Sequence, residues 1–442
     1  MAYLAGVWSL FGYSIAATRL AMLCLAAVTV LATFLLAIEL SRGLLGYPAF
    51  TAAALLLASP LFYTQAMMAQ LDMPAACLSL VTLLLYVRGR TGWAAVACVV
   101  LVLVKETGAM LPALLAWDLL RQRRWQEATL YLAPFLALLM WLLVLTQTTG
   151  NPLGDKGFAH YNVWYPLHPV RLAANVVRRI WYLFFDNLHI AGTLALVYAW
   201  RKGFYRNGPW RLLLQFFLLH VALVTVFGGA ALERYLLPAL PLFYIAVAAA
   251  LALLPTGWAA AARVALIAGL VAGLFFNPPY PFPFENNLAV VDFVRLQQAA
   301  AENIAARRPQ ATVASAWPFP DALRRPEFGY VPQTVRTVTL ENFHRDSVAQ
   351  LAASPPDILV IYSRTWEAPD GAVHWRWVRE FLQRYYNYQP QVDAVEIEQL
   401  LGMVQTARWE RRGQWIEIYE RSQHPSVAHD RDMFASCESF GF

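Results

Sequence analysis

Long apolar runs constrain this chain more than any other feature. A helix that crosses a bilayer needs about 20 mostly apolar residues, and ten runs satisfy or approach that length. They are Leu20–Leu40, Tyr47–Tyr63, Pro74–Val87, Trp93–Val104, Ala109–Leu120, Ala128–Leu145, Ile180–Trp200, Leu212–Phe227, Leu236–Leu254 and Val264–Phe276. Composition agrees, because 59% of the 442 residues are hydrophobic and 14% are charged, whereas soluble domains carry about 25% charged residues. The sequence predicts a mostly α fold in which residues 1–276 form a polytopic transmembrane helical bundle of about ten segments.

The basic residues in the connecting segments predict an orientation. Cytoplasmic loops of membrane proteins carry an excess of Lys and Arg, and alternate loops here hold eleven and seven basic residues. The richer set is Arg42, Arg88, Arg90, Arg121, Arg123, Arg124, Arg201, Lys202, Arg206, Arg211 and Arg263, and we expect it to be cytoplasmic. The other loops and the C-terminal region then lie outside.

The composition changes after residue 276. We expect a Pro-rich linker over 277–285, a small extracytoplasmic α/β domain over 286–421 and a tail over 422–442. Period and composition predict helices at 286–306, 347–353 and 375–388, strands at 311–317 and 357–362, and a hairpin of 401–408 with 414–421. This region has no Gly-rich phosphate-binding motif, so nucleotide binding lacks support.

Several other functions are disfavoured. The net charge of +6 is not accompanied by a basic and aromatic module outside the apolar part, so the charge does not indicate nucleic-acid binding. The cysteines show no CxxC spacing and support neither a disulfide framework nor a zinc site. His189 and His220 lie inside apolar runs without a second ligand at helical spacing, so we expect hydrogen-bonded histidines rather than metal ligands.

Charged residues collect at the ends of apolar runs on the predicted outer side. In the stretch Ala69–Glu106, two apolar runs flank the basic turn Arg88–Arg90, so Asp72 returns to the same side as Lys105 and Glu106. Ionisable groups at a membrane boundary are costly unless they are solvated or paired, and they often mark functional sites. The remaining members of this set are Asp155, Lys156, His160, Tyr161, Glu233 and Arg234.

Carboxylates and cations together suit the transfer of a group from a phosphate. A carboxylate takes a proton from the acceptor, while Lys or Arg neutralises the charge that develops on the leaving phosphate. In the alternative interpretation, Lys105 with Glu106 and Glu233 with Arg234 form local pairs at helix ends. The Gly-, Pro- and aromatic-rich segment 146–178 is predicted to be a long external loop, whose rings either face a ligand or lie at the lipid headgroups.

Four motifs, in order along the chain, resemble the polytopic glycosyltransferases of the GT-C class. They are FGYSIAATRL at 11–20, SPLFYTQAMMAQLDMP at 59–74, LVLVKETGAMLP at 101–112 and ERYLLPALPLFYI at 233–245. The most similar branch is that of the protein O-mannosyltransferases and aminoarabinose transferases. The resemblance covers about residues 1–276, and the C-terminal domain fits only the general plan of an extracytoplasmic domain after the last helix.

The resemblance implies an enzyme of the inner (plasma) membrane. Such enzymes take a sugar from a polyprenyl-phosphate donor and transfer it, on the periplasmic or outer face, to a lipid, glycan or protein acceptor. Asp72 matches the second acidic position of the family, Lys105 its lysine near the lipid phosphate, and Arg234 with Tyr235 its late Arg-Tyr pair.

The candidate site residues follow from these observations. We expect Asp72 and Glu106 as catalytic carboxylates, although many relatives have a small residue in place of Glu106. We expect substrate binding by Lys105, Glu233, Arg234, Tyr235, His160 and Tyr161. No cofactor is implied, and a divalent metal is left open.

The sequence departs from the family at its start. The family's principal carboxylate lies in a first external loop that follows a first transmembrane helix, and Met1–Gly12 resembles the end of that loop. We therefore expect either a start assigned too late or a truncated remnant that is inactive alone. A transporter or flippase of lipid-linked sugars is the alternative from another class, although such proteins usually carry internal repeats and mid-membrane polar residues.

Overall fold

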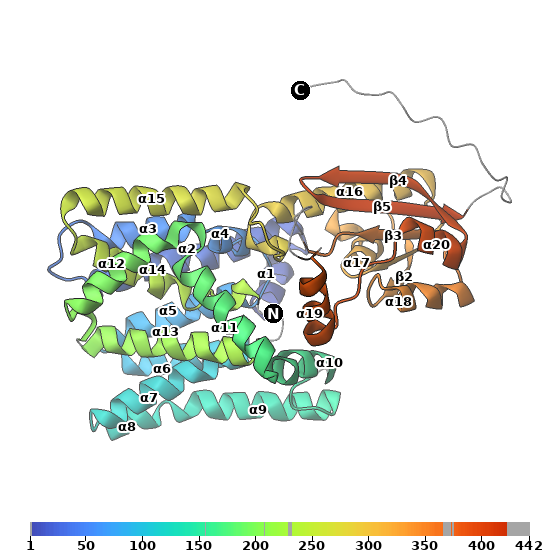
Figure 1. The fold of residues 1–442 in the computed structure, drawn as a ribbon. Coiled ribbons are helices and arrows are strands. Elements are labelled where there is room, and N and C mark those ends of the chain that lie inside the picture. Colours follow the sequence, from blue (N-terminus) through green and yellow to red (C-terminus); the bar gives the residue numbers. More distant parts are fainter. Residues whose placement is uncertain are drawn as a thin grey trace. The chain divides into compact units, whose positions relative to one another are not determined.

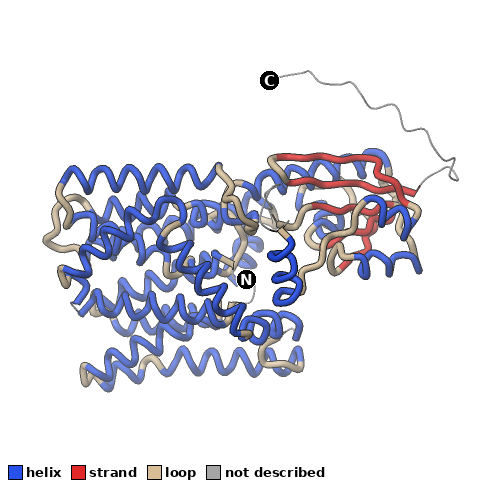
Figure 2. Tube along the Cα trace, in the orientation of Figure 1, coloured by secondary structure: helices blue, strands red, loops and turns tan. Residues whose placement is uncertain are grey.

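The computed structural model describes residues 2–154, 156–206, 208–228, 232–365, 373 and 375–421. Its chain divides into two compact units, the first comprising Met1–Val294 and Arg364–Tyr388, and the second Arg295–Ser363 and Gln389–Phe442. The chain therefore passes from one unit to the other three times. Helices make up the described part of the first unit, and the strands lie in the second (Figure 2).

The first unit is a bundle of helices (Figure 1). Most of them coincide with apolar stretches of the sequence, as the ten predicted runs require, so the mostly α polytopic fold is confirmed. The α-helices are α1 (Ala2–Phe11), α2 (Ile15–Leu40), α3 (Pro48–Ala58), α4 (Pro60–Gln65), α5 (Asp72–Val87), α6 (Thr91–Val104), α7 (Met110–Arg121), α8 (Trp125–Thr129), α9 (Leu132–Thr149), α10 (Lys156–Ala159), α11 (Pro169–Phe184), α12 (His189–Arg201), α13 (Gly208–Val226), α14 (Leu240–Ala252), α15 (Thr256–Phe275), the start of α16 (Ala289–Arg307) and α19 (Arg376–Tyr386).

Four helical stretches in the described residues are long and apolar enough to cross a membrane: Ile15–Leu40, Trp125–Thr149, Gly208–Val226 and Thr256–Phe275. A fifth span results if α11 and α12, which are bent by 44° at their junction, count as one. Five shorter apolar helices (α1, α3, α5, α6 and α14) accompany them. Only 17% of the span that contains α9 is buried, so its apolar side chains are available to lipid.

Breaks in the helices fall where the sequence supplies proline or a charged residue. The run Tyr47–Tyr63 is split at Ser59, because Pro60 has no amide hydrogen to continue α3 and instead starts α4. The predicted runs Trp93–Val104 and Ala109–Leu120 are separated, after α6, by extended Lys105 and a short 3-10 helix, Glu106–Ala109. These breaks place polar backbone and charged side chains at the ends of apolar helices.

The predicted external loop 146–178 is largely helical, which corrects that expectation. Helix α9 continues to Thr149, and α10, a π-turn and a 3-10 turn lead into α11 at Pro169. The His168 side chain accepts a hydrogen bond from the Val170 amide and caps α11. Helix α11 is amphipathic with arginines on one side, so a search for apolar runs alone does not find its first half.

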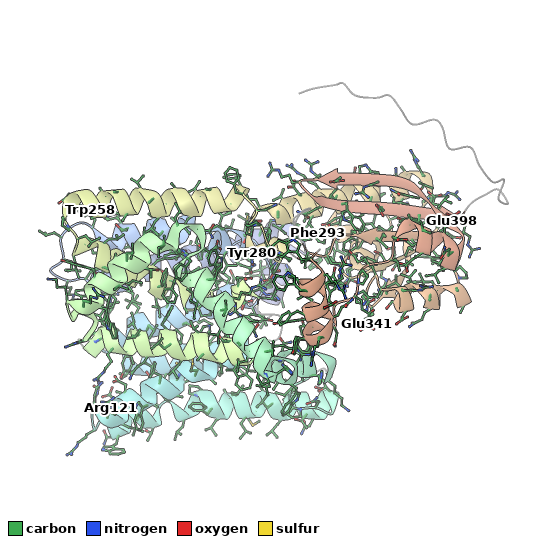
Figure 3. The ribbon with its side chains drawn as sticks, in the orientation of Figure 1. Arg121, Trp258, Tyr280, Phe293, Glu341 and Glu398 are labelled. Carbon is green, nitrogen blue, oxygen red and sulfur yellow. The ribbon has the colours of Figure 1, made fainter. Side chains whose placement is uncertain are left out.

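The packing centre of the first unit is α14, which is buried along nearly its whole length. It packs against α3 and α12, while α2 contacts α3 and α5, and α6 contacts α5 and α9 (Figure 1). In Figure 3, Arg121 at the end of α7 and Trp258 at the start of α15 lie at one end of this bundle, and Tyr280 lies toward the other. The bundle therefore has two distinct ends, and the candidate site lies at the one near Tyr280.

The second unit holds a five-stranded sheet in the order β2-β1-β3-β5-β4. Its strands are β1 (Thr312–Ala316), β2 (Arg336–Leu340), β3 (Ile358–Tyr362), β4 (Met403–Arg411) and β5 (Gln414–Arg421). Strand β1 pairs in parallel with β2 and β3, whereas β5 is antiparallel to β3 and β4. All five residues of β3 are buried, which agrees with a central strand that is covered on both faces.

Helices complete the second unit. α17 (Phe319–Arg324) packs against β1 and β2, and α20 (Ala394–Leu401) against β4, while α18 (Arg345–Ala349) contacts α20. The predicted strands, the hairpin and the helices at 286–306, 347–353 and 375–388 all have counterparts, whereas β2, α17 and α20 were not predicted. A capping box formed by Asp393 and Glu396 begins α20 and is the sequence signal for that helix. The predicted domain limits stay a prediction, and the predicted tail 422–442 lies outside the described residues.

Candidate functional site

Asp72, Lys105 and Arg234 form the centre of the candidate site. Asp72 is the first residue of α5, Lys105 follows α6, and Arg234 lies in a 3-10 helix, Glu233–Leu236, before α14. The Lys105 ammonium donates to Asp72 Oδ1, and Arg234 Nε lies 3.5 Å from Asp72 Oδ2. Asp72 is only 4% exposed, so a buried carboxylate at a helix N-terminus holds two cations from distant parts of the chain.

Tyr235 contacts Lys105 of this group through its aromatic ring. Its ring lies against the Lys105 ammonium, with 4.5 Å between Nζ and the ring centroid, a cation–π contact that helps to hold the ammonium in place. His220 on α13 bonds through Nε2 to the Tyr235 carbonyl oxygen, 2.8 Å away. The second intramembrane histidine, His189, bonds to the Tyr182 carbonyl and the Tyr244 hydroxyl. Both histidines are thus hydrogen-bonded, as expected from the sequence.

Glu285 belongs to the site although it was assigned to the linker. Arg234 NH1 lies 2.9 Å from Glu285 Oε1, and Gln70 Nε2 lies 3.4 Å from its other oxygen. The Glu285 carbonyl accepts a hydrogen bond of 2.6 Å from Thr64 Oγ1 on α4. Burial raises the pKa of the Glu285 carboxyl above its usual value, against the opposing effect of Arg234. The segment after α15 is therefore a structured part of the site.

Glu233 anchors a second set of charges beside the first. Its oxygens pair with Arg178 on α11 and accept from Asn286 Nδ2 at 2.7 Å. Burial alone would raise the pKa of Glu233, but Arg178, Asn286 and Arg179 together hold it below its usual value. The local pairs of the alternative interpretation, Lys105 with Glu106 and Glu233 with Arg234, do not form. Lys105 and Arg234 both lie against Asp72, and Glu233 pairs with Arg178.

Arg179 is the least satisfied cation of the site. It is 2% exposed, and its NH1 donates to the Leu232 carbonyl at 2.9 Å. Its Nε and NH2 atoms have no hydrogen-bond partner among the described residues, and no carboxylate there forms an ion pair with it. A buried guanidinium with unused donors is costly unless an anion joins it, so this residue indicates a place for a negatively charged ligand.

The other predicted residues lie at the edge of this group or apart from it. Glu106 is exposed and accepts a hydrogen bond of 3.3 Å from Trp141 Nε1 on α9. Tyr161 is half exposed, and its ring stacks on that of Tyr165. Partial burial raises the pKa of the Tyr161 hydroxyl, and the nearby Tyr165 and Tyr235 hydroxyls add to this effect. His160 is exposed on the π-turn, and Asp155 lies outside the described residues.

The described residues contain no group of three or more His, Cys, Asp or Glu side chains arranged to hold a metal ion. Asp72, Glu233 and Glu285 each already form an ion pair with a cation of the site. The ligand that this group of residues can still bind is therefore an anion. At the described centre of the site, four cations (Lys105, Arg178, Arg179 and Arg234) lie with three carboxylates (Asp72, Glu233 and Glu285), and Glu106 at the edge takes part in none of these ion pairs.

Two solved structures resemble most of the chain. One is the crystal structure of ArnT from Cupriavidus metallidurans bound to undecaprenyl phosphate, with a TM-score of 0.50, and the other is the same enzyme in the apo state, with a TM-score of 0.52. Each shares 16% sequence identity and covers 94% of this chain and 86% of the ArnT chain. The chain has the fold of ArnT. No protein-family model and no curated protein matches the sequence.

The ArnT fold agrees with the architecture expected from the motifs. Those motifs led to Asp72, Lys105, Arg234 and Tyr235, and the structure brings these four together. They did not lead to Glu285, Arg178 or Arg179. Arg178 and Arg179 could have been found from the sequence, because they are adjacent arginines directly before an apolar run. Nothing in the local sequence marks Glu285.

Proposed function

We propose that this protein is an integral membrane glycosyltransferase that takes a sugar from a polyprenyl-phosphate donor. The observation that carries the proposal is the buried Arg179, whose Nε and NH2 atoms have no hydrogen-bond partner among the described residues, together with the part-buried cations Lys105 and Arg234. A phosphate would supply the acceptors that Arg179 lacks. The ArnT fold supports this interpretation, because one ArnT structure holds undecaprenyl phosphate.

In the proposed reaction the acceptor nucleophile forms a bond to the anomeric carbon, and the bond from that carbon to the phosphate oxygen breaks. The bonding electron pair leaves with the polyprenyl phosphate, whose charge Lys105 and Arg234 stabilise. The acceptor can be a lipid, a glycan or a protein, and transfer takes place on the outer face of the membrane. Tyr235 holds the Lys105 ammonium in place through its ring.

The carboxylates take different roles in this proposal. Both oxygens of Asp72 face cations, so Asp72 is suited to positioning Lys105 and Arg234 around the phosphate. Glu106 is exposed and has no ion pair among the described residues, so it is the better placed of the two to accept the proton of the acceptor. His160 and Tyr161 remain proposed substrate-binding residues at the rim.

A transfer assay tests the function. Membrane vesicles that contain the protein are supplied with polyprenyl phosphate carrying a radiolabelled sugar, and labelled acceptor is counted. A hydrogen bond to a charged group contributes about 1.5–3 kcal/mol, so Lys105→Ala and Arg234→Ala should each reduce transfer by about tenfold or more. Arg121→Ala, at the opposite end of the bundle (Figure 3), is the matched control and should transfer normally.

The same assay separates the alternatives. A transporter or flippase would move the labelled lipid across the bilayer without forming a glycosidic bond, and an inactive remnant would do neither. Normal transfer by both Lys105→Ala and Arg234→Ala would refute the phosphate role of these residues.

A further inference from the structure

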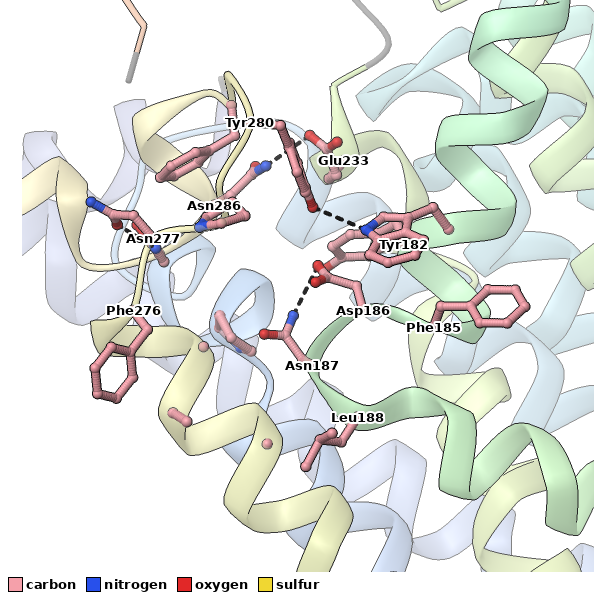
Figure 4. A pocket seen from close by; sticks show the side chains of 18 residues that line it. Tyr182, Phe185, Asp186, Asn187, Leu188, Glu233, Phe276, Asn277, Tyr280 and Asn286 are labelled. Carbon is pink, nitrogen blue, oxygen red and sulfur yellow. Dashed lines mark hydrogen bonds between the residues drawn. The ribbon is translucent and has the colours of Figure 1, made fainter. Parts of the chain in front are cut away.

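A cavity of about 420 Å³ lies in the first unit beside the charged site (Figure 4). It is formed by the junction of α11 and α12, the C-terminal half of α15 and the segment that follows α15. Aromatic rings form much of its wall, and polar groups project into it from Asp186, Glu233 and four asparagines. The rings belong to Trp181, Tyr182, Phe185, Phe276, Tyr280 and Phe282.

The turn that carries Asp186 into this cavity is held in an unusual conformation. Asn187 and Leu188 both have positive φ values, 50° and 62°, and residues other than glycine rarely adopt positive φ. Two glycines of α15 allow the turn to approach, because a Cβ on Gly273 would lie 2.0 Å from Asn187 Oδ1 and one on Gly269 2.4 Å from its carbonyl oxygen. Backbone strain of this kind clusters at binding sites and active sites.

Two hydrogen-bond acceptors in the cavity are left for a ligand. Asp186 receives a hydrogen bond of 3.0 Å from Asn187 Nδ2 and forms no ion pair among the described residues. Asn286 Oδ1 is buried and has no partner there. The oxygens of Glu233, by contrast, are already engaged by Arg178 and Asn286.

The chemistry of the walls restricts the ligand. A phosphate is disfavoured next to the Asp186 carboxylate, and an acyl chain would leave both acceptors unsatisfied. A sugar ring has hydroxyl donors for the acceptors and an apolar C–H face for an aromatic ring such as Trp181, whose Nε1 donates to the Tyr280 hydroxyl at 3.2 Å. Sugar rings therefore fit this combination of groups.

We propose that this cavity is a carbohydrate subsite that binds one monosaccharide ring. Asp186 and Asn286 accept hydrogen bonds from its hydroxyls, and Trp181 or Tyr280 packs against its face. The inference deepens the proposed glycosyltransferase function and rests on it for the identity of the sugar. Glu233 and Asn286 of the cavity directly adjoin Arg234 and Glu285 of the charged site, so the ring would lie beside the phosphate.

Binding is measurable without transfer. Saturation-transfer NMR on the full-length protein in detergent, with a panel of methyl glycosides of neutral hexoses, N-acetylhexosamines and amino sugars, should detect ring protons in contact with the protein. Asp186→Ala and Trp181→Ala should weaken binding by about tenfold or more. Trp258→Ala, which removes a 74% exposed tryptophan from the distant end of α15, should leave binding unchanged. Asp186→Asn keeps the shape of the side chain and serves if the alanine variant fails to fold, with an expected severalfold loss.

Competition identifies the source of the sugar. If the ring belongs to the donor, a polyprenyl-phosphate sugar displaces the methyl glycoside whereas polyprenyl phosphate does not. If it belongs to the acceptor, acceptor glycans displace it and the donor does not. Absence of saturation transfer to every glycoside, or equal transfer in wild type, Asp186→Ala and Trp181→Ala, would overturn the subsite. Lys105→Ala should retain glycoside binding, so failure of the subsite and failure of the phosphate site are distinguishable.

Discussion

At the scale of single residues, the site consists of buried and part-buried charged side chains that differ in how many of their polar atoms have partners. Asp72 has two cationic partners, and Glu233 has Arg178 and Asn286. Arg179 uses one nitrogen on a backbone carbonyl and has two nitrogens without partners among the described residues. Substitutions at satisfied and unsatisfied positions should therefore affect folding in opposite directions.

Arg179→Met is expected to stabilise the protein without ligand. Removing a buried charge that lacks a counterion relieves a desolvation penalty, and replacement of buried charges by apolar side chains often gains about 1–4 kcal/mol. The same change should weaken the binding of undecaprenyl phosphate by about tenfold or more. Thermal unfolding in detergent and a lipid-binding measurement check both effects. Binding as tight as in wild type would rule out Arg179 as a phosphate ligand.

Lys105→Ala provides the opposite case. It leaves the buried Asp72 carboxylate with Arg234 alone, at 3.5 Å. Breaking a buried pair costs about 3–5 kcal/mol when no partner remains, so we expect a loss toward the lower end of that range. The unfolding temperature should fall, unlike that of Arg179→Met.

Glu285 gives the site a predictable pH dependence. Because burial raises the pKa of its carboxyl in the folded protein above the ordinary value of 4.5, the folded state holds this proton more tightly than the unfolded state does. The contribution of Glu285 to stability is thus greatest below pH 4.5 and declines as the pH rises through the folded pKa. The difference in unfolding temperature, wild type minus Glu285→Gln, should be more positive at pH 4 than at pH 7. A difference that does not change with pH would contradict this pKa.

At the scale of elements, the breaks between helices, rather than the helices themselves, carry most of the charged residues of the site. Lys105 lies at the break after α6, Asp186 lies at the break between α11 and α12, and a 3-10 helix carries Glu233 and Arg234. Irregular backbone at membrane depth is tolerated where it lines a cavity or is buried in protein. The breaks are therefore consistent with a binding function for this end of the bundle.

A matched pair of glycines on α15 tests the break between α11 and α12. A Cβ added at Gly269 would lie 2.4 Å from the Asn187 carbonyl oxygen, whereas one added at Gly257 would have no atom within 4 Å. Gly269→Ala should destabilise the protein by about 1–3 kcal/mol. Gly257→Ala should be neutral or slightly stabilising, since alanine favours helix. Equal unfolding temperatures for the two variants would show that the turn moves freely.

Much of this architecture was accessible from the sequence, and the exceptions have physical causes. Apolar runs located most helices of the first unit because burial in lipid demands length and hydrophobicity. Helix α11 was missed over its first half because it is amphipathic, and strand β2 because four of its five residues are not buried. Asp186 lay inside the apolar run Ile180–Trp200, where an acidic residue is itself a signal of function.

The site was predicted in part for a similar reason. Asp72, Lys105 and Arg234 mark the ends of apolar segments, so their shared location follows from topology. Glu285 and Arg179 reach the same place only through tertiary packing, which hydropathy does not report. Pairing of Lys105 with Asp72 rather than with its neighbour Glu106 likewise depends on how α5 and α6 pack.

At the scale of the whole molecule, the orientation in the membrane makes a direct prediction. The basic loops at Arg88–Arg90 and Arg121–Arg124 should face the cytoplasm, and the β4–β5 turn at Arg412 should face outward. In a variant whose four native cysteines are replaced by serine, cysteine introduced at Arg412 should react with a membrane-impermeant maleimide in intact cells, whereas cysteine at Arg123 should react only after the membrane is opened. Reaction at Arg123 in intact cells would reverse the proposed orientation.

The path of the chain between its two units limits how the units can be exchanged by recombination. Because the polypeptide enters the sheet-containing unit, returns to supply α19 to the bundle and enters the sheet unit again, no single junction separates the two. A gene fusion or recombination event at one point cannot exchange the C-terminal unit for that of a relative without also dividing the bundle. The two units are thus expected to have diverged together as one inherited block, and chimaeras intended to swap acceptor preference need at least two coordinated junctions.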